Sequence, residues 1–218
     1  MLKIYTNKLQ KLINLSNDDV KDAQVVILGF ESVGKVSYKH ELSGNENKLL
    51  EIASFSKQTK KIVIAGAYTD NYGLLKKSAI IAENGKILGI SDMNLAFDES
   101  EFASGGSFKV YQTSVARIGV VVSDDILSLE GVKAMALCDA DIIVAVLCDE
   151  EKPQHNFLIR AYSYLFGVPI VMLTKTGVIA SDMLGEICGK GFDVISNLII
   201  PVKKQYLIVK SKRRGVKE

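Results

Sequence analysis

Tryptophan is absent from the sequence, and cysteine, histidine and proline are scarce. The 218 residues include three cysteines, two histidines and three prolines. Cys138, Cys148 and Cys188 are widely spaced and form no Cys-x-x-Cys pair, which argues against a disulfide framework and against a zinc site. Two histidines are too few for a multi-histidine metal centre. We therefore expect neither a metal nor another cofactor.

Long apolar runs are also missing. No segment approaches the roughly 20 uninterrupted apolar residues that a membrane helix needs. The first five residues, from Met1 to Tyr5, lack the apolar stretch of a signal peptide. These absences predict a cytoplasmic protein with no membrane partner. Because 48% of the residues are hydrophobic and 24% are charged, we expect a single domain over residues 1–218 with a substantial core.

The excess of positive charge is small and gathers late in the chain. The net charge is +2, and basic residues cluster at Lys203 and Lys204 and again from Lys210 to Arg214. Such a segment suggests either contact with nucleic acid or acidic lipid, or a solvated end. Aromatic residues that would stack on bases are not interleaved with the lysines. We favour the solvated end and expect no nucleic-acid partner.

Short apolar runs predict buried strands. Residues 78–82 and 86–90 flank Asn84-Gly85, which predicts a hairpin because both central residues of a type I′ turn need φ > 0. Continuous runs typical of strands covered on both faces occur at residues 24–29, 61–66, 115–122, 141–147 and 169–173. Further strands are predicted at residues 107–113, 194–201 and 205–209.

Helices are predicted between these strands. Residues 45–57 carry an apolar stripe, and residues 153–166 are followed by Gly167, a typical helix end. Ser123 and the acids after it suit the start of a helix that runs to about Cys138. The first twenty residues fit either a strand over residues 2–5 or a helix over residues 7–15. The order of elements predicts an α/β layered sandwich.

The segment from Gly29 to Lys35 follows a buried strand and partly matches a phosphate-binding P-loop. That loop needs serine or threonine directly after its lysine to bind Mg²⁺. Val36 stands there instead, and Ser37 is one residue late. A nucleotide-binding module built on residues 29–35 is therefore an alternative and not the main interpretation.

Ser123 lies between a predicted strand and a predicted helix, where the nucleophile elbow of a serine hydrolase lies. The glycines that flank such a serine are missing, and the sequence places neither His40 nor His155 beside it as a base. We therefore favour a helix cap as the role of Ser123.

Taken in order, several blocks within residues 20–182 resemble the nitrilase, or carbon–nitrogen hydrolase, superfamily. Residues 22–31 are similar to the family's strand that ends in a catalytic glutamate, residues 78–89 to its hairpin, and residues 117–125 to its nucleophile strand. The resemblance implies a nitrilase-like α-β-β-α sandwich, with mixed sheets and helices outside. It also implies a small amide, nitrile or carboxylate-type ligand and a homodimer.

The family uses a glutamate as base, a lysine beside the tetrahedral intermediate and a cysteine as nucleophile. Carried over by position, Glu31 is the glutamate, Met93 stands at the lysine position and Ser123 stands at the cysteine position. Asp125 matches the acidic residue that usually follows the nucleophile.

Three further residues are expected to support this site. Glu99, in the block that resembles the segment after the family's lysine, is either a supporting acid or a surface charge. Cys148 ends the strand after the one that leads to Ser123, and Lys175 follows the next strand. Because free cysteines are often buried, we interpret Cys148 first as a core residue.

The two replacements predict impaired hydrolysis. A serine hydroxyl is far less acidic than a thiol and needs stronger activation. Met93 brings no charge, and the loss of one oxyanion donor typically slows a reaction about a hundred- to a thousandfold. The main prediction is a hydrolase-type protein that retains Glu31 and binds a carbonyl compound. The alternative is an active amide hydrolase that uses Ser123, with Glu31 as base and Lys175 as cation.

Overall fold

The structure is a computed structural model that describes residues 1–95, 101–193 and 195–201. Glu99, the strand expected at residues 205–209 and the basic residues from Lys203 to Arg214 lie outside these ranges.

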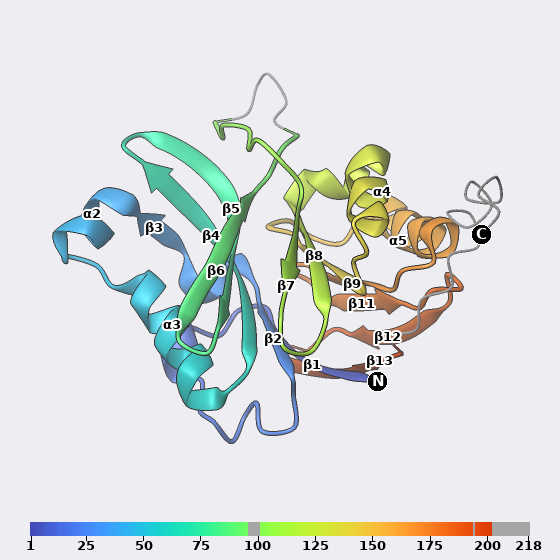
Figure 1. Ribbon diagram of the computed structural model, residues 1–218, viewed down its shortest axis with the longest axis horizontal. Helices are drawn as coiled ribbons and strands as arrows, with labels where there is room; N and C mark the ends of the chain where they lie inside the picture. Colours follow the sequence, from blue (N-terminus) through green and yellow to red (C-terminus); the bar gives the residue numbers. More distant parts are fainter. Residues whose placement is uncertain (96–100, 194, 202–218) are drawn as a thin grey trace, which may run out of the picture.

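Two sheets face each other in the described part of the chain (Figure 1). The first has the order β13-β1-β2-β4-β5-β6, and the short β3 pairs with β4. The second has the order β12-β11-β10-β9-β8-β7. The strands are β1 (Leu2–Asn7), β2 (Val25–Leu28), β3 (Lys35–Ser37), β4 (Ile62–Asn71), β5 (Leu74–Glu83), β6 (Lys86–Asp92), β7 (Lys109–Gln112), β8 (Arg117–Val122), β9 (Ile142–Val146), β10 (Ile170–Leu173), β11 (Val178–Ser181), β12 (Ile187–Gly191) and β13 (Ile195–Ile200).

Each sheet has a parallel centre. Strands β1, β2 and β4 run parallel to one another, as do β8, β9 and β10. Their continuous apolar sequences agree with burial on both faces. Because parallel strands end at the same edge of a sheet, the segments after β8, β9 and β10 lie at one edge of the second sheet. The segment after β2 of the first sheet meets them there, since Glu31 lies 3.9 Å from Lys175.

The longer helices cover the outer faces of both sheets. The helices are α1 (Phe30–Val33), α2 (Tyr38–Ser43), α3 (Lys48–Thr59), α4 (Leu129–Leu137) and α5 (Pro153–Phe166), with short 3₁₀ helices η1 (Leu12–Asn14) and η2 (Ser123–Leu127).

Three apolar clusters hold these layers together. Between the sheets, a cluster contains residues of both, for example Ile64 and Val144. A second joins the first sheet to α3 through Ile52, and a third joins the second sheet to α4 and α5 through Met135 and Ile159. The layers are helix, sheet, sheet and helix, so the predicted α-β-β-α sandwich is confirmed.

Local signals explain most of the element boundaries. The helix expected at residues 153–166 is confirmed, and Gly167 ends it with a φ of 65°. The Asn84-Gly85 hairpin is confirmed with φ values of 50° and 82°. The helix expected from Ser123 to about Cys138 is divided into η2 and α4 instead. In the N-terminal region, strand β1 forms and is followed by η1, not by the alternative helix over residues 7–15.

The segment from Gly29 to Lys35 does not form the strand–loop–helix arrangement of a P-loop. Helix α1 ends within the segment, and Lys35 begins strand β3 instead of a helix. The Lys35 ammonium lies 2.8 Å from the Asp70 carboxylate. The nucleotide-binding alternative therefore loses its structural basis.

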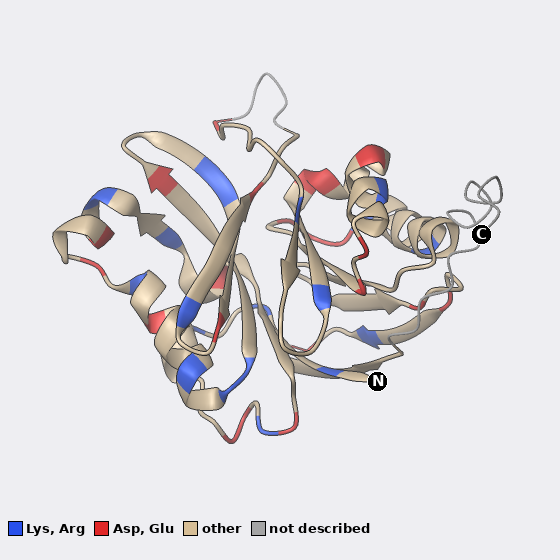
Figure 2. Cartoon of the chain, in the orientation of Figure 1, with Lys and Arg blue, Asp and Glu red and all other residues tan. Residues whose placement is uncertain are grey.

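Charged residues lie mostly on helices, loops and strand ends, and the centres of the sheets carry few of them (Figure 2). Among the described residues, no helix is both long enough and apolar enough to cross a membrane.

Candidate active site

Glu31 lies just beyond the carboxyl end of β2, as predicted. Gly29 links β2 to α1, which carries Glu31. A larger residue does not fit at this position, because a Cβ atom there would lie 2.5 Å from the carbonyl oxygen of Lys8. The Glu31 carboxylate lies 3.9 Å from the ammonium of Lys175, and each side chain is nearly half exposed. Lys175 therefore lies beside Glu31, which is its ion-pair partner.

Ser123 directly follows β8 and is buried, with a φ of 48°. A positive φ in a non-glycine residue costs about 1–3 kcal/mol and persists where the surrounding structure imposes it, often at functional sites. The predicted helix-cap role of Ser123 is wrong, because its side chain caps neither helix. Ser128 caps α4 instead and accepts a hydrogen bond from the Gly131 N–H at 3.0 Å.

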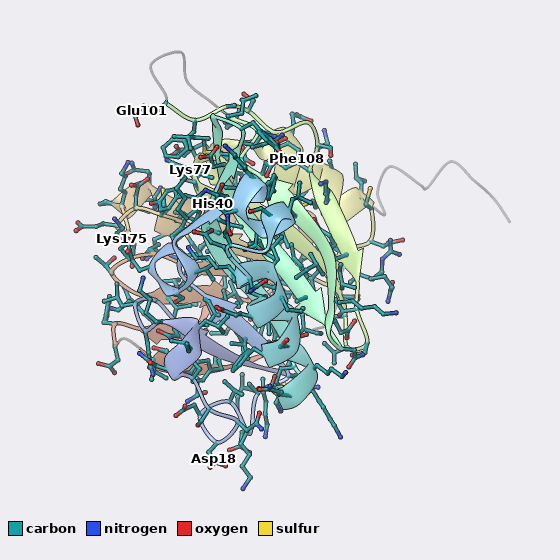
Figure 3. All side chains as sticks on the ribbon, turned by 90° about the vertical axis from the view of Figure 1, so that its left-hand side faces the viewer. Asp18, His40, Lys77, Glu101, Phe108 and Lys175 are labelled. Carbon is teal, nitrogen blue, oxygen red and sulfur yellow. The ribbon has the colours of Figure 1, made fainter. Side chains whose placement is uncertain are left out.

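Lys77 supplies a cation that the sequence analysis missed. Its ammonium donates a hydrogen bond to Ser123 Oγ at 3.5 Å and lies 3.9 Å from Asp124, with only 14% of the side chain exposed. Figure 3 shows Lys77 at the upper end of the molecule, away from the loop that carries Asp18. Strand β5 therefore delivers a positive charge to the serine on the facing sheet.

Met93 is almost fully buried in the cluster between the sheets. Its backbone N–H donates to the carbonyl of Lys77 at 2.9 Å, so Met93, directly after β6, is the neighbour of Lys77 on β5. On the other side of Lys77, Tyr68 is its partner in the β4–β5 ladder. Met93, which the resemblance places at the family's lysine position, thus lies next to Lys77, although the two are 16 positions apart in the sequence.

Cys148 follows β9 and lies beside Ser123. Its Sγ lies 3.3 Å from Ser123 Oγ and 3.4 Å from the Asp149 carboxylate. Burial raises the pKa of the thiol, while the hydrogen bond to Ser123 and the charge of Lys77 oppose that rise. We call Lys77, Ser123 and Cys148 the strand-end cluster.

Tyr68 connects this cluster to Glu31. Burial, together with the nearby Cys148, Glu31 and Asp149, raises the pKa of Tyr68 to about 12. Its ring packs against Phe30 at 5.0 Å and against Phe102 at 5.7 Å between ring centroids. The Lys77 ammonium lies 5.3 Å from the centre of the Phe102 ring. Aromatic side chains therefore border the ammonium, which strengthens its electrostatic interactions.

Asp125 holds two parts of the site together. Its buried carboxylate accepts hydrogen bonds from the backbone N–H groups of Asn94 and Leu95, at 2.9 and 2.7 Å. Burial raises the pKa of Asp125, and these hydrogen bonds act in the opposite direction. The contacts fix the segment after Met93 against η2, so Asp125 positions the chain around Ser123.

The structure thus brings Ser123, Cys148 and the unexpected Lys77 into contact, and it pairs Glu31 with Lys175. Glu99 lies outside the described residues. Over the described ranges, no group of three or more histidine, cysteine, aspartate or glutamate side chains is arranged to hold a metal ion.

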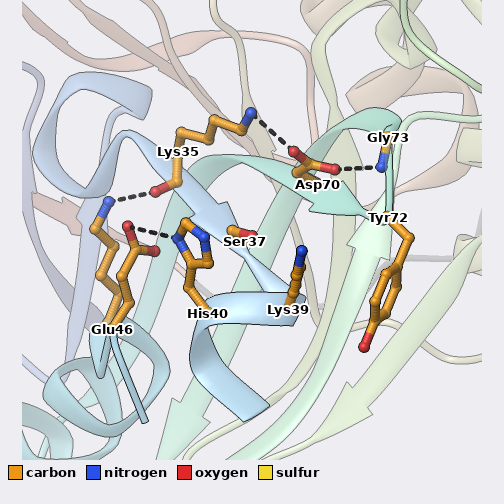
Figure 4. A pocket seen from close by; sticks show the side chains of 9 residues that line it. Lys35, Ser37, Lys39, His40, Glu46, Asp70, Tyr72 and Gly73 are labelled. Carbon is orange, nitrogen blue, oxygen red and sulfur yellow. Dashed lines mark hydrogen bonds and ion pairs between the residues drawn. The ribbon is translucent and has the colours of Figure 1, made fainter. Parts of the chain in front are cut away.

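A cavity of about 490 Å³ lies away from these residues, around β3, α2 and the β4–β5 turn (Figure 4). We call it the surface cavity. Its polar side chains contact one another, as in Lys35 with Asp70 at 2.8 Å and His40 with Glu46 at 3.7 Å. Its lining includes Lys35, Lys39, His40, Glu46, Asp70 and Tyr72.

Comparison with known proteins identifies the family. The sequence model of the carbon–nitrogen hydrolase family matches residues 7–202. No curated protein matches the chain significantly.

Similar solved structures support the same fold. A carbon–nitrogen hydrolase from Helicobacter pylori superposes with a TM-score of 0.71 at 18% identity, covering 92% of this chain and 90% of that one. An amidase from Nesterenkonia sp. gives 0.76 at 12% identity, covering 99% and 96%. A glutamine-dependent NAD⁺ synthetase from Acinetobacter baumannii gives 0.71 at 16% identity, covering 90% of this chain but 45% of that one. The chain belongs to the carbon–nitrogen hydrolase family.

Proposed function

We propose that the chain binds a small amide, nitrile or carboxylate-type compound at the strand-end cluster, and that hydrolysis through position 123 is impaired. The observation that carries the proposal is the Lys77 ammonium, which lies 3.5 Å from Ser123 Oγ and is largely buried. An ammonium in such a partly dry site favours a ligand oxygen that carries full or partial negative charge.

The impairment follows from the groups around Ser123. In the described part of the chain, its Oγ contacts an ammonium and a thiol, and neither is a strong proton acceptor at neutral pH. The Glu31 carboxylate is engaged with Lys175. A serine hydroxyl needs an adjacent base to become nucleophilic. Ser123 therefore lacks the activation that acyl transfer requires.

An active amide hydrolase that uses Ser123 is the second candidate. The positive φ of Ser123 and the nearby Lys77 favour it, because serine–lysine pairs occur among nucleophilic hydrolases. In this alternative Glu31 is the base, and Lys77 replaces Lys175 as the cation beside the serine.

Ligand binding and turnover separate the two candidates. We expect acetate and acetamide to bind in calorimetry and to raise the melting temperature. Ammonia release from a panel of small amides is expected to be undetectable or unaffected by Ser123→Ala. Ammonia release that disappears in both Ser123→Ala and Glu31→Gln would support the active serine hydrolase instead.

Reversion tests whether Lys77 replaces the family's lysine. If it does, Ser123→Cys alone produces amide hydrolysis, measured under reducing conditions because the new thiol would lie near Cys148. Adding Met93→Lys then gives no further gain, since a second ammonium would be buried beside the first. Activity in the double variant alone would show that Lys77 does not perform this role.

We also propose a cytoplasmic homodimer. The supporting observation is apolar surface on α4 and α5, where Leu137, Phe157 and Tyr164 are exposed. Exposed apolar patches of this kind often mark interfaces between subunits. Sedimentation measurements test the dimer, and Phe157→Asp is expected to shift it towards monomer. An unchanged dimer in this variant would place the interface elsewhere.

A further inference from the structure

The two groups that positions 93 and 123 lack are both present one strand away. Lys77 is the neighbour of Met93 across the sheet, through the 2.9 Å hydrogen bond from the Met93 N–H. Ser123 follows Val122, and Cys148 lies two residues beyond Val146, which is the ladder partner of Val122. The ammonium and the thiol are therefore each found on the strand next to the one expected to carry them. Both contact Ser123 Oγ, at 3.5 and 3.3 Å.

A proton acceptor for the thiol is also in place. The Cys148 thiol donates to the Asp149 carboxylate at 3.4 Å. Because burial raises the pKa of Cys148, the free thiol keeps its proton near neutral pH, and attack on a ligand requires such an acceptor. Asp149 itself is only partly buried, so it has access to solvent.

We propose that Cys148 is the nucleophile of this site, with Lys77 stabilising the oxyanion and Asp149 accepting the thiol proton. The inference rests on the proposed function for the ligand class, which is small amides. It differs from the earlier expectation, in which Cys148 is a core residue near an inactive serine.

The reaction runs in balanced steps. The sulfur of Cys148 attacks the amide carbon, a C–S bond forms, the C=O π electrons move to oxygen beside Lys77, and the thiol proton passes to Asp149. The C–N bond then breaks as the nitrogen takes that proton and leaves as ammonia, and a thioester remains. Water attacks the thioester, the C–S bond breaks, and a carboxylic acid and the free thiol result.

The other two cysteines provide an internal control. Cys138 and Cys188 are exposed, whereas Cys148 is only 3% exposed. If burial alone sets the order in which the three cysteines react, Cys148 reacts last with any reagent. If Cys148 is the nucleophile, an amide-bearing electrophile reacts with it first, because the site binds the amide beside the sulfur.

The experiment treats the whole protein with 2-chloroacetamide and follows each cysteine by peptide mass spectrometry. Sulfur displaces chloride, and the thiol proton passes to the carboxylate. We expect Cys148 to be alkylated at least about tenfold faster than Cys138, since positioning a reactant gives gains of this size or more. Excess acetamide is expected to protect Cys148 alone. Lys77→Met is expected to slow Cys148 labelling about tenfold and leave Cys138 labelling unchanged, which also shows that the variant is folded.

Each outcome bears on a different claim. Labelling of Cys148 slower than that of Cys138 and Cys188, while acetate and acetamide still bind in calorimetry, overturns the nucleophile and leaves the proposed function intact. Loss of both labelling and binding overturns both. Fast labelling of Cys148 that acetamide does not protect and Lys77→Met does not slow would reflect a merely reactive thiol, and it also overturns the inference.

Discussion

The strand-end cluster and the surface cavity contain similar residue types in different arrangements. In the cluster, Lys77 Nζ and Cys148 Sγ lie 3.5 and 3.3 Å from Ser123 Oγ, and all three residues are largely buried. In the surface cavity, Lys35 is paired with Asp70 and is 58% exposed. An exposed pair contributes about 0–1 kcal/mol and is screened by salt, whereas desolvated groups interact strongly. The surface cavity is therefore the weaker candidate for a site that binds a charged ligand.

The cluster owes its character to its position between the sheets. It is built at the ends of β8 and β9 and from β5 of the facing sheet, so each side chain is held by a strand packed in the core. The surface cavity is formed by the short β3, by α2 and by a turn. Paired residues of the same type in the two regions allow direct tests of this difference.

The largest expected effect comes from two lysines. Lys77→Met is expected to weaken acetate binding about tenfold to a hundredfold, because a hydrogen bond to a charged group contributes about 1.5–3 kcal/mol. Lys39→Met, in the surface cavity, is expected to change affinity less than about twofold, in line with an exposed charge. Calorimetry measures both. Equal losses in the two variants would remove the distinction between the regions.

A smaller effect is expected from two tyrosines. Tyr68→Phe is expected to lower the free energy of unfolding by about 1 kcal/mol, because it removes a hydroxyl that interacts with the Cys148 thiol. Tyr72→Phe is expected to change it by less than about 0.5 kcal/mol, since Tyr72 is 69% exposed in the surface cavity. Urea unfolding measures both values. A Tyr68 variant as stable as the Tyr72 variant would mean that the hydroxyl contributes nothing.

The smallest expected effect concerns pH and two histidines. Burial, followed by the charge of Lys152, lowers the pKa of His155 below its ordinary value of 6.5, against the opposing effect of Asp124, Glu151 and Asp149. Between the two pKa values, His155 is therefore mostly protonated in the unfolded chain and mostly neutral in the folded chain. His155 thus makes the protein less stable as the pH falls from about 6.5 to the lower pKa of the folded state.

His155→Asn is expected to reduce this loss of stability, measured by urea unfolding at pH about 7 and about 5.5. Asparagine can still accept the backbone hydrogen bond that the Lys152 N–H donates to His155 Nδ1. His40→Asn, in the surface cavity, serves as the control because half of the His40 side chain is exposed. The same reduction in both variants would assign the pH effect to a cause other than burial.

Several features of the fold followed from local patterns. The runs at residues 24–29 and 141–147 became β2 and β9, because continuous apolar residues are stable only with both faces covered. Asn84-Gly85 forms its turn because these two residue types accept positive φ. Strand β12 was not predicted, since it is short and largely exposed and has little apolar pattern. Strand β11 was not predicted either, although its four residues are buried.

The sequence by itself determined the order of the central strands and of helices α3 and α5, and the place of Glu31 at the end of a strand. These depend on neighbouring residues, whose spacing and polarity are visible in the chain. Only the tertiary structure decided that Lys77 lies beside Met93 and Ser123, and that Cys148 lies 3.3 Å from Ser123 Oγ. Register between strands and the packing of one sheet on the other set those contacts, and both depend on residues far apart in the sequence.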